Sequence, residues 1–193
     1  MLLDAFLTFQ DTQAGTPAGE TRDETFKEAG AMEINSFELK PLKKDSTFGL
    51  DLAEDDGDDG KQKKKKQKKN KHAGKHSFTA SFDKELDSAS PDLLIAYCRY
   101  LASPEKCKSI KQVHVSVRKA GAGRRLVFLE FLLKEVYVIS YKLSADDGGK
   151  PPKEDIELGF EYCQIIYRPQ KPDGTLGRDK GADYDFRKNE STS

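Results

Sequence analysis

The sequence contains few of the residues from which covalent cross-links, metal centres or membrane spans are built. Its 193 residues include three cysteines, three histidines and no tryptophan. The odd number of cysteines and the lack of a Cys-x-x-Cys pair exclude a disulfide framework and disfavour a structural zinc site. No apolar run approaches the roughly 20 residues that a membrane-spanning helix needs. We therefore expect no membrane insertion.

Catalytic signatures are also missing. The sequence has no Gly-x-Ser-x-Gly, His-Glu-x-x-His or P-loop pattern. His72 and His76 have the spacing of metal ligands on a helix, but a glycine between them disfavours a helix, and His114 falls within an expected strand. Cys107 and Cys163 have no acid–base neighbours in the sequence. We therefore predict no catalytic, cofactor-binding or metal-binding residue, and a protein that is not an enzyme.

The charge is balanced overall but segregated along the chain. Lys and Arg together number 33, as do Asp and Glu, which argues against a surface built as a whole to bind nucleic acid. An acidic stretch is followed by a basic run, and no apolar side chain lies between Ala53 and Ala73. Such a segment buries too little apolar area to offset an ordering entropy of about 1–2 kcal/mol per residue. We predict a disordered charged loop.

Patterned sequence stands on both sides of this loop, so we interpret it as an insertion, at about 41–76, in a single domain spanning 1–193 with a polar tail from about 187. Two interpretations of its charge stay open: a solvated run without a specific partner, or a nucleic-acid-binding arm that begins at Lys61 and ends at Lys71. The charged residues that could form contacts are Glu54, Asp55, Asp56, Asp58, Asp59, Lys63, Lys64, Lys65, Lys66, Lys68 and Lys69.

Outside the loop, a two-residue alternation of apolar and polar side chains dominates and predicts β-strands. The segments are 3–10, 32–39 with a break in alternation at Ser36, 78–82, 110–117, 126–140 with a bend near Lys134 and Glu135, 156–167, and 184–186. About seven strands with short connections indicate a mainly β fold, an antiparallel β-barrel or a two-sheet sandwich. The segment 126–133 is apolar on both faces, so we expect the helix or another copy to cover its outer side.

One helix is expected on the flank of this sheet. Ser90, Pro91 and Asp92 form a helix start, because they provide an N-cap, a proline in the first turn and an acid near the positive end of the dipole. Leu94, Tyr97, Cys98 and Leu101 then follow at helical spacing and predict the stripe that packs on the sheet, with Cys98 as a small core residue.

The residues that lead into this helix have a recognisable spacing. Lys84, Asp87, Ser90, Pro91 and Leu93 fit the pattern Lys-x-x-Asp-x-x-Ser-Pro-x-Leu, which resembles the hallmark of the Hcp family, the tube proteins of bacterial type VI secretion systems. The opening segments 4–7, 19–23 and 33–37 and the closing segments 133–141, 157–170, 173–174 and 184–186 resemble that family in the same order. The resemblance covers about 1–40 and 77–188.

This resemblance implies a small two-sheet β-barrel with a helix on its flank and no cofactor. It implies homohexameric rings that stack head-to-tail into a tube, which a contractile sheath expels together with a VgrG-type spike and whose lumen carries effectors. The protein would then leave the bacterial cytoplasm for the medium or a target cell without a cleaved signal peptide. Consistently, Asp4 directly follows Met1, Leu2 and Leu3, which is not the pattern of a secretory leader.

The charged insertion departs from the family pattern, because the corresponding family loop, which extends toward the adjoining ring, is shorter and less charged. We predict that the basic residues 63–71 of one copy meet the acidic residues 54–59 of another. Tubes should then shorten as salt rises, since charges are screened over about 8 Å at physiological ionic strength. Electron microscopy of tubes at low and high salt checks this, and a tube length that ignores ionic strength would contradict it.

Overall fold

The computed structural model describes residues 3–11, 15–41, 78–121, 123–145, 148–149 and 151–191. The charged residues 54–59 and 63–71 lie outside the described residues. The limits of the expected single domain and of the polar tail therefore stay predictions. Within the described ranges, no helix is long and apolar enough to cross a membrane.

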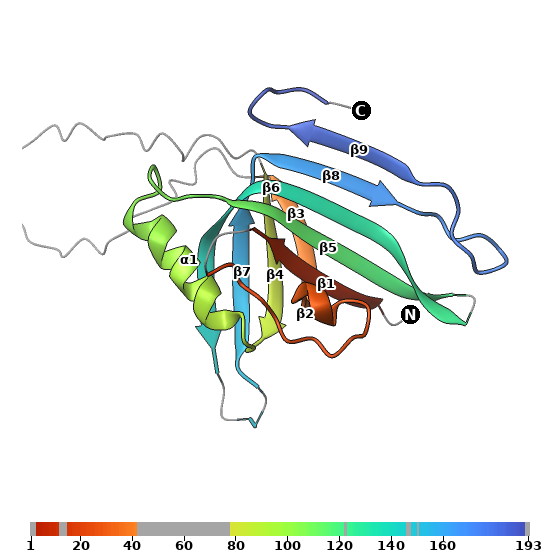
Figure 1. The fold of residues 1–193 in the computed structure, drawn as a ribbon, viewed down its shortest axis with the longest axis horizontal. Coiled ribbons are helices and arrows are strands. Elements are labelled where there is room, and N and C mark those ends of the chain that lie inside the picture. Colours follow the sequence, from red (N-terminus) through yellow and green to blue (C-terminus); the bar gives the residue numbers. More distant parts are fainter. Residues whose placement is uncertain are drawn as a thin grey trace, which may run out of the picture.

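The described chain forms nine strands, one α-helix and one short 3-10 helix (Figure 1). All of the strand pairings are antiparallel. The elements are β1 (Leu3–Gln10), η1 (Lys27–Ala29), β2 (Met32–Ile34), β3 (Ser36–Pro41), β4 (Phe78–Glu85), α1 (Ser90–Ala102), β5 (Ile110–Gly121), β6 (Arg124–Ser144), β7 (Lys153–Gly159), β8 (Tyr162–Tyr167) and β9 (Lys180–Asp185).

The long strand β6 belongs to two layers of strands. Its first half pairs with β5 and β8, and its second half pairs with β7. One layer therefore contains β2, β1, β5, β6, β8 and β9, and the other contains β6, β7, β4 and β3. The mainly β, antiparallel fold with one flanking helix is confirmed. The ladder order from β2 to β3 is open among the described strands, so the sheet does not close into a barrel.

The chain crosses between the layers at four places, once through α1 between β4 and β5 and three times within or directly between strands. The predicted bend near Glu135 is confirmed, and this residue has a φ of 53°. The predicted strand 32–39 is split at Asn35 into β2 and β3, which pair with different layers. The predicted strand 156–167 is wrong as a single element, because it is split at 160–161 into β7 and β8. Glu161 N donates to Lys134 O at 3.1 Å, next to the bend of β6.

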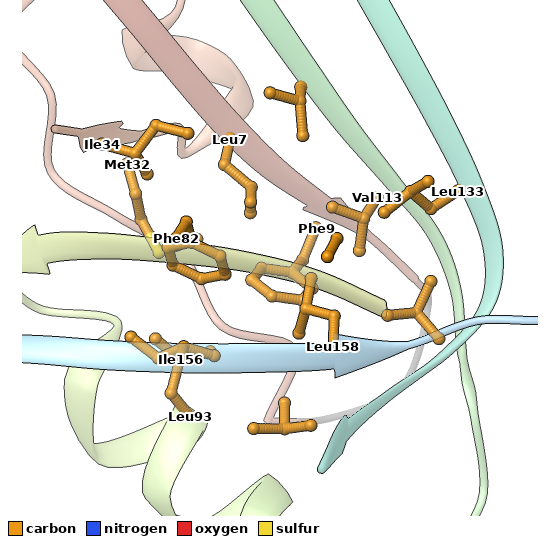
Figure 2. Packing of buried hydrophobic residues seen from close by; sticks show 14 of the residues in the cluster. Leu7, Phe9, Met32, Ile34, Phe82, Leu93, Val113, Leu133, Ile156 and Leu158 are labelled. Atoms are coloured by element: carbon orange, nitrogen blue, oxygen red, sulfur yellow. The ribbon is translucent and has the colours of Figure 1, made fainter. Parts of the chain in front are cut away.

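The hydrophobic core lies between the two layers. Figure 2 shows the inward side chains of both layers directed toward one another, with Leu93 of α1 closing one side. Full burial of a large aliphatic or aromatic side chain contributes about 1.5–3 kcal/mol, so this cluster is the main source of stability. Its fully buried members include Leu7, Met32, Leu93, Val113, Val115, Leu133, Val136, Ile156 and Leu158.

A loop at residues 15–31 covers the outer face of β1 and β5. Phe6 of β1 stacks on Phe26 of this loop with ring centroids 4.4 Å apart. The Arg118 guanidinium lies 4.5 Å from the Phe6 centroid and donates to both carboxylate oxygens of Asp23 at 2.6 and 3.1 Å. These hydrogen bonds hold the pKa of Asp23 below its usual value. The loop therefore covers the outer face of β1 and β5, and the cover expected for the outer side of 126–133 on β6 stays a prediction.

The helix packs on the later part of β6, and it does so through a different face from the one that periodicity predicted. Leu93 is fully buried and Tyr100 is 8% exposed, whereas Leu94 and Leu101 are 42% and 52% exposed. Cys98 is also exposed, so its assignment to the core was wrong. The helix carries apolar side chains on two faces, and for this reason helical spacing alone could not identify the face that packs on the sheet.

The neighbouring leucines of α1 provide a matched test of this orientation. We expect Leu93→Ala to lower the free energy of unfolding by about 2–5 kcal/mol, because it leaves a cavity in the core. Leu94→Ala should change it by no more than about 0.5 kcal/mol, because this side chain is exposed in a single copy. Urea unfolding of dilute, dissociated protein measures both. Equal losses in the two variants would contradict the orientation of the helix.

Candidate functional site

The hallmark residues meet at a buried ion pair beneath the start of α1. Lys84 of β4 lies opposite Glu154 of β7 in the strand register, and both point into the interior. The Lys84 Nζ atom is 2.6 Å from Glu154 Oε2, and both side chains are fully buried. Removing two charges from water costs several kcal/mol per ion, so such a pair is stable only when further hydrogen bonds satisfy both groups.

Those hydrogen bonds come from the segment that begins the helix. Lys84 Nζ is also 2.7 Å from Asp87 Oδ1, 3.2 Å from Ser90 Oγ and 2.8 Å from Glu85 O. Ser90 Oγ lies 2.8 Å from Glu154 Oε2, to which it donates. The Lys84 ammonium is therefore surrounded by acceptors and closed to solvent. It positions the neighbouring segments, and no substrate can reach it.

Each hallmark residue thus has an identifiable structural role. Asp87 Oδ1 accepts from Ala89 N at 2.9 Å, while Asp87 N donates to Ser90 Oγ at 3.0 Å. The prediction that Ser90 is the N-cap was wrong, because Ala89 holds that position and Ser90 is the first residue of α1. Pro91 occupies the first turn of α1, where its missing N–H costs nothing. Leu93 enters the core. The segment therefore fixes both the start of the helix and its rotation about its own axis.

Sequence reasoning missed two members of this buried cluster. Glu154 carries the counter-charge, and its second oxygen, Oε1, accepts from the Tyr141 hydroxyl of β6. Burial and the Glu154 carboxylate raise the pKa of Tyr141. The available signal was the alternation of Glu154 with Ile156 and Leu158, which places the three on one face of β7. The prediction began this strand at Ile156 and so did not include the carboxylate.

A second feature of the described residues is an apolar stripe on the outer side of α1, which we call the α1 ridge. Its members recur at helical spacing and are all exposed. Leu94, Ile95 and Leu101 have exposed fractions of 42%, 47% and 52%. The ridge consists of Pro91, Leu94, Ile95, Cys98, Leu101 and Ala102.

A third feature is an apolar groove of about 620 Å³, which we call the β8–β9 groove. It lies between β8 and β9 of the first layer and Leu39 of β3 and Phe78 of β4 in the second layer. Phe78, Ile165 and Tyr184 line it and are 36–39% exposed. Its remaining lining residues are Leu39, Phe160, Cys163, Ala182, Asp183, Phe186 and Asn189.

The family follows from comparison with known proteins. A family model described as "Type VI secretion system effector, Hcp" matches residues 6–167, so the chain belongs to the Hcp family of type VI secretion. Members of this family are secreted structural proteins that form oligomeric rings, and it is not an enzyme family. The resemblance found in the sequence is confirmed.

Individual relatives agree with this assignment. The chain is 34% identical over 97 residues to the protein hcp1 of Pseudomonas aeruginosa, an alignment that spans 49% of this chain and about half (54%) of that protein. The fold is similar to that of Hcp1 from Salmonella typhimurium, with a TM-score of 0.67 and 21% identity over 99% of both chains. A further type six secretion system protein has a TM-score of 0.70 and 18% identity over 99% of this chain and 100% of its own.

The buried pair gives a prediction about stability. Lys84→Met or Glu154→Gln alone should lower the free energy of unfolding by about 3–5 kcal/mol, because each leaves a buried group without its partner. The double variant should cost less than the sum of the two, because it removes both charges together. Urea unfolding of the unaltered protein, the two single variants and the double variant gives the coupling energy between Lys84 and Glu154.

A matched control lies on the outside of the same strands. Lys142 of β6 and Asp155 of β7 form an exposed pair at 3.7 Å, with side chains 72% and 58% exposed. Lys142→Met should therefore cost no more than about 1 kcal/mol. If Lys84→Met lowered the free energy of unfolding no more than this control, the buried pair would not stabilise the fold as proposed.

Proposed function

We propose that this chain is a tube subunit of a type VI secretion system. Six copies form a ring, and rings stack head-to-tail into a tube that a contractile sheath expels from the bacterial cytoplasm together with a VgrG-type spike. Effectors are carried in the lumen. Family membership supports this function. The observation that carries it is that one copy has a complete core but leaves both the α1 ridge and the β8–β9 groove uncovered.

Closed rings are the assembly that suits these surfaces. Exposed apolar patches of several hundred Å² on a soluble protein mark an interaction site. A two-fold dimer uses one patch on both copies, so it could cover both surfaces only if they belonged to one patch. The ridge and the groove are separate, because α1 packs on the later part of β6 and β8 pairs with its first part. A head-to-tail ring uses two different patches on every copy, and its closure leaves neither of them exposed.

The role proposed for the charged segment 54–71 rests on its sequence alone. The acidic group (Glu54, Asp55, Asp56, Asp58 and Asp59) and the basic group (Lys63–Lys66, Lys68 and Lys69) carry opposite charge. We propose that they attract one another between stacked rings. No described residue favours the alternative use of the run from Lys61 to Lys71 as a nucleic-acid-binding arm.

The assembly has a direct test. Native mass spectrometry of the purified chain should give six times the protomer mass of 21.6 kDa, and electron microscopy should show rings with an open centre. The same preparation should not bind DNA at physiological salt, since binding through a basic arm would be electrostatic. A monomer at micromolar concentration would contradict the tube function, and salt-sensitive DNA binding by that monomer would favour the basic-arm alternative.

A further inference from the structure

We propose that the α1 ridge of one copy docks into the β8–β9 groove of the next copy around the ring. This inference rests on the proposed ring and names the two surfaces that hold it together. It makes the contact head-to-tail, since the two surfaces belong to different elements of the fold. Leu94, Ile95 and Leu101 of one copy would then pack on Phe78, Ile165 and Tyr184 of its neighbour.

The ridge is unusual for a helix on the outside of a protein. A surface helix normally presents polar side chains on the face opposite the core, and one that is apolar on both faces is normally buried. The inner face of α1 is already packed, because Leu93 is fully buried and the Tyr100 ring lies 5.9 Å from that of Tyr137. The outer face presents Leu94, Ile95 and Leu101 to solvent. We therefore expect the outer face of α1 to be covered by a neighbouring copy in the assembled ring.

The groove is the concave counterpart of this ridge. Phe78 and Tyr184 are 39% and 36% exposed, and aromatic side chains present about 150–250 Å² each, so these two leave roughly 100–200 Å² of aromatic surface uncovered. A standard interface buries about 800 Å² on each partner. The groove therefore fits the apolar centre of such an interface, around which the polar rim supplies the remaining area.

The two surfaces also match in length. The ridge runs from Pro91 to Ala102, which at a rise of 1.5 Å per residue is about 16 Å. Strand β9, which forms one wall of the groove, runs from Lys180 to Asp185, which at about 3.3 Å per residue is also about 16 Å. A helix of this length would therefore run along the whole of β9.

Charge favours an uncharged occupant. Arg187 is paired with Glu161 and Asp185, and Arg168 with Glu130 and Asp179, within the same copy. Asp183, which lines the groove, accepts a hydrogen bond from the Tyr162 hydroxyl at 2.9 Å. None of the six ridge residues carries a charge. The ridge therefore brings apolar surface to the groove without burying an unpaired charge, which would be costly.

A charge-swap series tests this contact. Ile95→Lys on the ridge and Ile165→Glu in the groove each bury a charge in an apolar interface. Each should raise the concentration at which rings dissociate at least about 100-fold. The double variant places opposite charges across every interface and should recover at least about tenfold of this loss. Lys142→Glu, on an exposed strand face elsewhere, should leave the dissociation concentration within about threefold. Native mass spectrometry over a dilution series gives these values.

The possible results separate this contact from the ring itself. Rings that survive both single substitutions would overturn the contact and leave the tube function standing, whereas a monomeric unaltered chain would overturn both. A double variant no better than the single ones would show that the ridge does not meet the groove. Thermal unfolding followed by circular dichroism reports folding. A lower melting temperature with unchanged ring mass in Ile165→Glu would mean that the chain's own residues fill the groove, which also overturns the contact.

Cross-linking gives a second readout that needs no loss of assembly. Cys98 lies on the ridge, and Ala182→Cys adds a thiol to the exposed wall of the groove. The background carries Cys107→Ser and also Cys163→Ser, because Cys163 itself lines the groove. A short bismaleimide should join Cys98 of one copy to position 182 of the next and produce a ladder of up to six chains. The same protein with Cys98→Ser should give no ladder. A ladder that does not depend on Cys98 would overturn the contact.

Discussion

The buried ion pair between Lys84 and Glu154 is the constraint on which the rest of the structure depends. Neither charge is tolerable without the other, and the pair itself is stable only because Asp87, Ser90 and Tyr141 supply the remaining hydrogen bonds. These groups come from β4, β6, β7 and the start of α1. The pair therefore joins the second layer of the sheet to the helix, and it does so in one geometry, since hydrogen bonds are directional in a way that apolar contacts are not.

The two-layer arrangement was only partly visible in the sequence. Alternation identified the strands and the bend near Glu135, because both features are local properties of the chain. It joined β7 and β8 into one strand, because Phe160 keeps the apolar period across a position where the chain changes layers. A change of layer is fixed by which strand lies alongside, and this information comes from residues distant in the sequence.

The site shows the same limit. The spacing of Lys84, Asp87 and Ser90 was readable because these residues lie within one short segment. Glu154 is 64 residues beyond Ser90, and nothing local distinguishes it from the exposed acids around it. Only the register between β4 and β7 places it opposite Lys84. The packing face of α1 was missed for a related reason, because Leu93 and Leu94 are equally apolar and only the contacts of Ser90 determine which of them faces inward.

This last point links the polar cluster to assembly. A helix that is apolar on two faces can pack on a sheet in two orientations with similar gains from burial, so hydrophobicity alone does not specify one of them. The second orientation would remove the Ser90 hydroxyl from between Lys84 and Glu154 and leave buried charges unsatisfied, at a cost that apolar contacts do not recover. The ion cluster therefore directs Leu93 into the core and, as a consequence, directs Leu94 and Ile95 outward. The proposed ring needs an apolar surface that is not part of the subunit's own core. The buried salt bridge beneath the helix keeps Leu94 and Ile95 exposed for this contact.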